Sequence, residues 1–287
     1  MKIKLFDPHV GIDEQQAIKR TLMSKFWASG QGSGNVSKFE KKFKRFIDSD
    51  TCVAVNSGTA ALNLAVSLIP IKGKEVILPS LSFVSTANSV LINGGIPKFV
   101  EVEPDTLCID PISIKNSITK KTKLILPVHF GGFPCKLDEI KKIADKNGCH
   151  IIEDAAHAVG SKFSTQKIGK HSFATCFSFH PVKNLAMPTG GLISINHPDH
   201  KKFEKKLKSL RWCGISNRKL TSYDVTELGN NYYMNEFSAA IGLVQLKKIN
   251  RLTKMRQKIA KKYFNEIDIE DKMPFDRRCS YHLYWIC

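Results

Sequence analysis

Lys183 has the surroundings that best suit covalent amine chemistry in this chain. It follows the largely apolar run Phe173–Phe179 and precedes a small loop that closes on Gly190 and Gly191. An apolar approach removes water from an ammonium group, and that loss lowers its pKa. A lysine with a lowered pKa can form an imine with a carbonyl compound. Most other lysines are expected to be solvated, since 44 Lys and Arg face 26 Asp and Glu.

Three other segments carry polar groups at the ends of predicted strands. The turn Ser57–Gly58–Thr59 leads into a predicted helix, so it is either an anion site or an ordinary N-cap. Asp154 could be a metal ligand, a helix cap or the partner of a protonated ring nitrogen. His157 could be a packed core histidine or a functional one. Ser178 adds a hydroxyl five residues before Lys183.

These groups together match the needs of one cofactor. The turn at Thr59 offers a phosphate cradle, Phe83 a face for stacking, and Asp154 a counter-ion for a pyridinium nitrogen. Ser178 completes the set with a hydroxyl that can donate a hydrogen bond to the phosphate, and Lys183 completes it with an amine. Pyridoxal phosphate requires this combination of a cradle, a stacking face, a counter-ion and an amine.

An alternation of strand-like and helix-like segments must position these residues. Amphipathic stretches near residues 59–69, 83–93 and 136–147 lie between short β-rich runs. This order predicts an α/β fold with a mainly parallel, seven-stranded sheet flanked by helices. Ligands of such sheets bind beyond the carboxyl ends of the strands, where the polar groups above fall. The predicted strands are 52–55, 75–78, 98–102, 124–128, 150–153, 174–178 and 191–195.

Two domains of unequal size are expected. Residues 1–245 should form a large cofactor-binding domain, whose N-terminal segment could pack with the smaller one. A helical pattern from Asn235 to Asn265 bridges toward a small C-terminal domain that begins within residues 246–287. The alternation in Tyr281–Cys287 is typical of a strand that has only begun, so we expect the small domain to be truncated.

Composition excludes several classes of protein. A chain of 287 residues with 42% hydrophobic residues is typical of a soluble globular protein. No apolar stretch of about 18 residues suits a membrane span, and no secretory pattern opens the chain, so a cytoplasmic protein without a membrane partner is expected. The eight cysteines lack a C-x-x-C pair, which favours neither a metal site nor a disulfide framework.

The net charge of +18 leaves more than one interpretation open. Lysines in 38–45 and 201–208 alternate with apolar residues, as on the solvated faces of amphipathic helices. A phosphate-attracting field would also suit a nucleotide-linked substrate. A non-catalytic regulator or nucleic-acid-binding protein remains an alternative, although no nucleic-acid partner is favoured. Gly30–Gly34 resembles a phosphate loop, yet no strand precedes it, which argues against a dinucleotide site.

The chain resembles the DegT-type (DegT/DnrJ/StrS) sugar aminotransferases, which use pyridoxal phosphate on the aspartate-aminotransferase fold, fold type I. The resemblance covers essentially the whole chain and rests on several motifs in the same order. Those motifs start with Trp27 and its glycine-rich follow-on and continue with Asn56–Leu62, Pro79–Asn88, Glu153–His157, Ser178–Asn184, Gly229–Glu236 and Ala239–Leu246.

This resemblance implies a role for each candidate in the reaction. Lys183 would bond to the cofactor and move a proton between substrate and cofactor. Asp154 would keep the pyridine nitrogen protonated, Phe83 would stack on the ring, and His157 would contact the ring or its phenolic oxygen.

The resemblance also implies a shared phosphate site and two subunits. Ser57, Gly58, Thr59 and Ser178 would hold the phosphate, and Asn231 would reach in from a second subunit. The expected assembly is therefore a homodimer with shared active sites.

A keto-sugar on a nucleotide diphosphate is the substrate that the resemblance implies, with L-glutamate as amino donor, in the biosynthesis of surface polysaccharides or secondary-metabolite sugars. A related branch of pyridoxamine-dependent sugar dehydratases typically has histidine in place of Lys183, so the lysine favours transamination. Pro188–Thr189 and Cys213 depart from the family pattern. These departures concern the loops that would line the sugar pocket.

Overall fold

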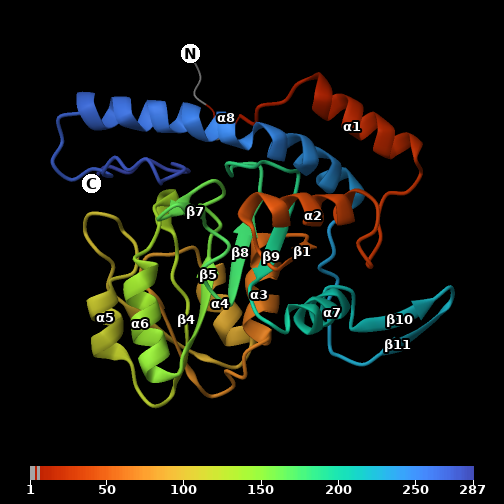
Figure 1. Cartoon of the computed structure of the whole chain (residues 1–287), viewed down its shortest axis with the longest axis horizontal. Helices are drawn as coiled ribbons and strands as arrows, with labels where there is room; N and C mark the ends of the chain where they lie inside the picture. Colours follow the sequence, from red (N-terminus) through yellow and green to blue (C-terminus); the bar gives the residue numbers. More distant parts are fainter. Residues whose placement is uncertain (1–3, 5–6) are drawn as a thin grey trace.

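A seven-stranded sheet forms the centre of the molecule, and helices cover both of its faces (Figure 1). The computed structural model describes residue 4 and residues 7–287. Neighbouring strands are parallel except around β9, which runs antiparallel to both β1 and β8. In spatial order the strands are β1 (Thr51–Val55), β9 (Gly191–Ile195), β8 (Ala174–Ser178), β5 (His150–Asp154), β4 (Thr122–Ile125), β2 (Glu75–Pro79) and β3 (Ile96–Val100).

Two apolar cores, one on each face, hold the sheet between its helices. Successive strand residues point to opposite faces, so Val53 lies in one core and Ala54 in the other. The first core packs α3 (Gly58–Ser67), α4 (Ser85–Ile92) and α7 (His200–Leu210) on the sheet. The second packs α2 (Asn35–Ile47), α5 (Pro111–Ser117) and α6 (Leu137–Asn147). The predicted mainly parallel sheet is thus confirmed.

A long helix runs along one side of the molecule (Figure 1). Helix α8 (Glu236–Glu266) has 31 residues, which corresponds to a length of about 45 Å. It begins at Asn235, whose Oδ1 accepts a hydrogen bond from Ser238 N at 2.8 Å. Helices α1 (Ile12–Met23) and α2 pack against it (Figure 1). The predicted domain division at residue 245 falls inside this helix, and the division itself stays a prediction.

The C-terminal segment turns back beneath α8 (Figure 1). Residues 281–287 do not form the expected strand, and an isolated bridge pairs Lys272 with Ile286 instead. Tyr281 has a φ of +49°, which interrupts an extended backbone, and its side chain is buried. Met273, Cys279 and Tyr281 enter the same core as α2 and α6. This segment therefore packs on the body of the molecule.

Two short hairpins were not predicted from the sequence. Strands β10 (Ile215–Lys219) and β11 (Ser222–Val225) form one that projects beside α7 (Figure 1). Strands β6 (Lys162–Phe163) and β7 (Gln166–Lys167) form the other. A 3-10 turn, η1 (Phe130–Gly132), follows β4.

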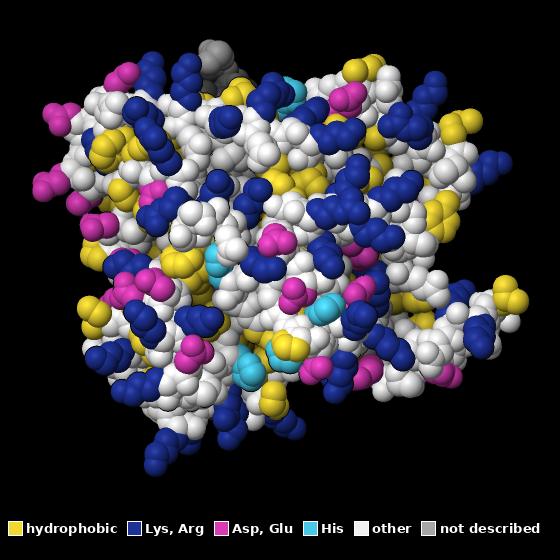
Figure 2. All heavy atoms as spheres, viewed as in Figure 1, with side chains coloured by type: hydrophobic (Ala, Val, Ile, Leu, Met, Phe, Trp, Pro, Cys, Tyr) yellow, Lys and Arg dark blue, Asp and Glu magenta, His cyan; other side chains and the backbone are white. Residues whose placement is uncertain are grey.

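Lysine and arginine side chains are spread over the face of the molecule that Figure 2 shows. The two lysine-rich segments form α2 and α7, with Phe39, Phe43 and Leu207 buried while most of their lysines are exposed. The interpretation as amphipathic helices is therefore confirmed. Within residue 4 and residues 7–287, no helix combines the length and apolar character needed to span a membrane.

Candidate active site

A cavity of about 320 Å³ opens at the carboxyl ends of β1, β5 and β8. This volume is within the range of small-molecule sites, which begins at about 300 Å³. Eight of the nine predicted site residues line it, namely Ser57, Gly58, Thr59, Phe83, Asp154, His157, Ser178 and Lys183. The fold thus brings together side chains that lie up to 126 positions apart, from Ser57 to Lys183.

The amino end of α3 forms one wall of the cavity. Ser57 Oγ accepts a hydrogen bond from Ala60 N at 3.1 Å, so Ser57 is the N-cap of α3. A Cβ atom on Gly58 would lie 2.7 Å from Ser178 Cβ, which is too close for any other residue. The absence of a side chain leaves the free N–H groups of this first turn beside the hydroxyls of Thr59 and Ser178. Such a turn fits a phosphate group.

The glycine after the lysine loop, Gly191, is also required on steric grounds. Gly191 begins β9 and pairs with both Val55 and Ser178. A Cβ atom on Gly191 would lie 2.2 Å from the carbonyl oxygen of Ser57. Glycine therefore lets the lysine loop return to the sheet directly against the phosphate-type turn.

Asp154 lies at the end of β5, where its side chain is almost completely buried. Its Oδ2 accepts from Thr86 Oγ1 at 2.8 Å, and its Oδ1 accepts from Ala156 N at 3.1 Å. Burial raises the pKa of Asp154, and these hydrogen bonds and the Lys183 charge only partly counter it. A carboxylate in this position gains stability from a protonated partner in the cavity.

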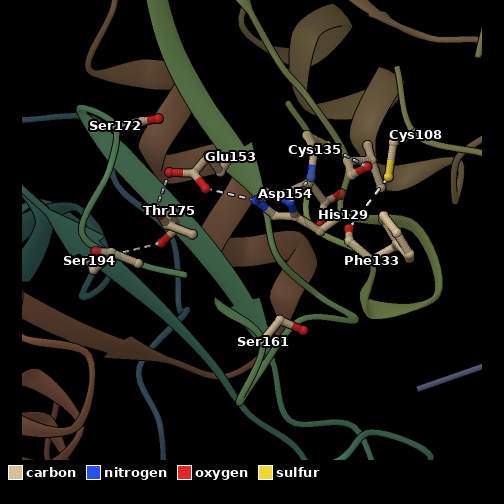
Figure 3. A network of polar contacts seen from close by, with 12 residues as sticks. Cys108, His129, Phe133, Cys135, Glu153, Asp154, Ser161, Ser172, Thr175 and Ser194 are labelled. Atoms are coloured by element: carbon tan, nitrogen blue, oxygen red, sulfur yellow. Dashed lines mark hydrogen bonds and ion pairs between the residues drawn. The ribbon is translucent and has the colours of Figure 1, made fainter. Parts of the chain in front are cut away.

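Behind Asp154, a buried polar network fixes the end of β5 (Figure 3). His129 Nε2 lies 2.7 Å from Glu153 Oε2, and both side chains are fully buried. Thr175 Oγ1 donates to Glu153 Oε1 at 3.1 Å. Because Cys135 N donates to His129 Nδ1 at 3.1 Å, His129 must carry its proton on Nε2 and donate it to Glu153.

The pKa of Glu153 is lowered by this network. Burial raises it, but the hydrogen bond from the His129 ring, together with the smaller effects of neighbouring polar groups, outweighs burial. Sequence reasoning did not select His129 or Glu153. The sequence did contain a signal for Glu153. Successive side chains of a strand point to opposite faces, so Glu153 must lie on the opposite side of the sheet from Asp154. No sequence feature marked His129 as its partner.

Lys183 occupies the loop after β8 and is partly buried. Its backbone N donates to His180 O at 2.8 Å, which forms a tight turn. Burial lowers the pKa of Lys183, and the Asp154 carboxylate partly opposes this shift. The expected lowered pKa is therefore present, and its cause is the expected loss of water.

His157 lines the cavity and also packs against neighbouring rings. Its Nδ1 accepts from Gly131 N at 3.3 Å, so the proton of the neutral ring resides on Nε2. Burial and the Lys183 charge lower the pKa of His157 to about 3, which keeps the ring neutral near pH 7. His157 can therefore donate one hydrogen bond from Nε2.

Phe83 and Asn231 differ in their relation to the cavity. Phe83 lines it while remaining 71% exposed, so the ring is an open apolar face. Asn231 does not line it, and its carbonyl oxygen accepts from Asn56 Nδ2 at 3.2 Å. The placement of Asn231 in a partner's site stays a prediction.

The donor set at this cavity fits pyridoxal phosphate. It combines a helix amino end without a side chain at Gly58, a buried carboxylate at Asp154, and a partly buried amine at Lys183. The part of the chain that the structure describes contains no cluster of three or more His, Cys, Asp or Glu side chains suited to a metal ion.

Comparisons with known proteins agree with this geometry. The family model of the DegT/DnrJ/EryC1/StrS aminotransferases matches residues 8–287. The spore coat polysaccharide biosynthesis protein SpsC of Bacillus subtilis is 38% identical over 291 residues, which cover 96% of this chain and 73% of SpsC.

Two solved structures have closely similar folds. The PLP form of Spr1654 of Streptococcus pneumoniae, assigned as a sugar aminotransferase, is 26% identical with a TM-score of 0.92, over 99% of this chain and 77% of that one. PseC of Helicobacter pylori, an aminotransferase of pseudoaminic acid biosynthesis, is 27% identical with a TM-score of 0.92 over the same shares. The chain therefore belongs to the DegT/DnrJ/EryC1/StrS aminotransferase family and is a pyridoxal-phosphate-dependent aminotransferase of fold type I.

Proposed function

We propose that this enzyme transfers an amino group from L-glutamate to the keto group of a sugar carried on a nucleotide diphosphate. The observation that carries the proposal is the joint presence of Lys183, Asp154 and the α3 amino end on one cavity. The polysaccharide and pseudoaminic acid pathways in the names of SpsC and PseC support a sugar substrate. The excess of 18 positive charges would favour the approach of a doubly phosphorylated nucleotide.

Bound pyridoxal phosphate would supply an aldehyde carbon that receives the amino group and a ring that withdraws electrons from the substrate. Lys183 would hold the cofactor and, once its amine is free, take a proton from the substrate carbon and return it. An amine with a lowered pKa is suited to both tasks, because its neutral form is more populated at neutral pH.

The other lining residues would hold and polarise the cofactor. Asp154 would accept a hydrogen bond from the protonated ring nitrogen, which a buried carboxylate stabilises strongly. His157 would donate from Nε2 to an oxygen on the ring. The α3 amino end with Thr59 and Ser178 would bind the phosphate, and stacking would cover the exposed ring of Phe83.

We further propose a homodimer in which Asn231 serves the partner's phosphate site. Apolar side chains with more than half of their surface exposed support an interface of this kind. They lie on α4 and β3 and on the segment that leads to Asn231, namely Leu91 (56%), Ile92 (66%), Ile96 (52%), Phe99 (55%) and Leu228 (97%).

The purified protein with added pyridoxal phosphate tests this function. Wild type should show visible absorbance from the lysine-held cofactor, and L-glutamate alone should change that spectrum as the amino group is transferred. Lys183→Ala should lose the visible band, whereas Lys201→Ala, an exposed lysine on α7, should keep it. A panel of keto-sugar nucleotides should then restore the first spectrum.

Two outcomes would contradict the proposal. A visible band that persists in Lys183→Ala would remove the role of the lysine. Loss of a sugar hydroxyl without uptake of nitrogen would indicate the related dehydration reaction, which the retained lysine disfavours.

A further inference from the structure

The segment Cys279–His282 lies against three separate parts of the active site, although the sequence placed it in another domain. Cys279, Ser280 and Tyr281 are each at most 3% exposed. The segment follows the turn beneath α8 and reaches the loops after β4, β5 and β8 (Figure 1). Three contacts between this segment and the active site indicate what the segment does there.

The first contact is with His157, through Gly131. Gly131 N donates to His157 Nδ1 at 3.3 Å, and Gly131 O accepts from His282 N at 2.8 Å. One glycine, with a φ of +61°, thus binds the His157 ring on one side and the C-terminal segment on the other. A shift of the His282 backbone would move the donor that fixes His157.

The second contact is between the rings themselves. The rings of His157 and His282 lie 4.3 Å apart between centroids, with 41° between their planes. His282 Nδ1 has no hydrogen-bond partner among the residues that the structure describes. The contact between the two histidines is therefore one of packing, with the ring of His282 against that of His157.

The third contact reaches the lysine loop. Asn184, the residue after Lys183, is buried and donates from Nδ2 to Ser280 O at 3.1 Å. Ser280 Oγ donates to His157 O at 3.3 Å. Ser280 thereby joins the loop that carries Lys183 to the loop that carries His157.

We propose that His282 is a positioning residue of the active site, which holds His157 with Nδ1 as acceptor and Nε2–H directed to the cofactor. The segment around it keeps the two loops in register through Ser280. This inference rests on the proposed role of His157 in binding pyridoxal phosphate. It also makes the C-terminal segment a part of the catalytic unit.

The test compares His282→Leu, which keeps apolar volume without a ring, with His282→Phe, which restores a ring face. His200→Ala, on α7, is the histidine control. Circular dichroism of each variant of the 287-residue chain establishes folding. The two readouts are the Kd of pyridoxal phosphate, from its visible absorbance, and the tautomer of His157, from nitrogen NMR of histidine-labelled protein assigned with His157→Gln.

His282→Leu should raise the Kd by about two- to tenfold, the range expected for the loss of one aromatic pair. It should also give a mixture of His157 tautomers, whereas His282→Phe and His200→Ala should match wild type. Wild-type values in His282→Leu, or equal damage in both His282 variants, would overturn the proposal. The tautomer is measured without cofactor, so a failure of the proposed function, seen as a persistent band in Lys183→Ala, is a separate result.

Discussion

Glu153 and Asp154 are adjacent residues of one strand, and their surroundings shift their pKa values in opposite directions. Both side chains are buried, and each accepts a hydrogen bond from a threonine hydroxyl. The pKa of Glu153 is nevertheless lowered and that of Asp154 raised. Burial is the same for both, so the partners decide the direction.

The difference lies in the ring that faces each carboxylate. Glu153 receives Nε2–H of His129 at 2.7 Å, whereas Asp154 faces an open cavity. With Asp154 in its proposed role, the strand would present the same pairing twice, once with the protein's own imidazole and once with the pyridine ring of the cofactor. One carboxylate would then be complete on folding, and the other would be completed by a ligand.

The largest effect should come from removing the carboxylate on the cavity side. Asp154→Ala should lower kcat by about 100- to 1,000-fold, the usual loss when a preorganised electrostatic partner is removed. Its neighbour provides the matched variant, since Glu153→Gln keeps the cavity-side carboxylate and should retain most of kcat. Spectroscopic rates of the glutamate half-reaction measure both. Equal losses in the two variants would remove the functional distinction.

The next effect concerns stability on the network side. His129→Leu leaves the buried Glu153 with the Thr175 hydroxyl but without its imidazole donor, which should lower the free energy of unfolding by about 1.5–3 kcal/mol. Urea unfolding of the cofactor-free protein at pH 7 measures this loss. Since the folded pKa of Glu153 is below its unfolded value near 4.5, its contribution is present above that pH and lost as pH falls further. The penalty of His129→Leu should therefore shrink in acid.

The smallest effect has the opposite sign. Asp154→Asn should raise the free energy of unfolding of the cofactor-free protein by roughly 1 kcal/mol, because it removes a buried charge that has no ring partner. The folded pKa of Asp154 is above its unfolded value near 3.8, so its ionisation costs stability at neutral pH, and that cost disappears in acid. Saturating pyridoxal phosphate should reverse this order of stability, because it should raise the free energy of unfolding of wild type more than that of Asp154→Asn. A less stable cofactor-free variant would refute this.

The sequence predicted the parts of the molecule that depend on local patterns. Short apolar runs predict all seven strands. The residues at the ends of those runs include Asp154, Ser178 and Lys183, which line the cavity. His129 could not be predicted, because its partner Glu153 lies 24 residues away on another strand end. The path of the C-terminal segment could not be predicted. The alternation of residue types in Tyr281–Cys287 predicts an extended strand, whereas tertiary packing buries Tyr281 at a positive φ.

The antiparallel strand β9 has a consequence for the order in which the enzyme folds. Thr51 of β1 pairs with Ile195 of β9, a separation of 144 residues. Pairings this distant close large loops, which slows folding and exposes unpaired strand edges in the interval. The first strand therefore cannot pair within the sheet, nor the turn at Ser57 reach its final position, until the Lys183 loop has been synthesised.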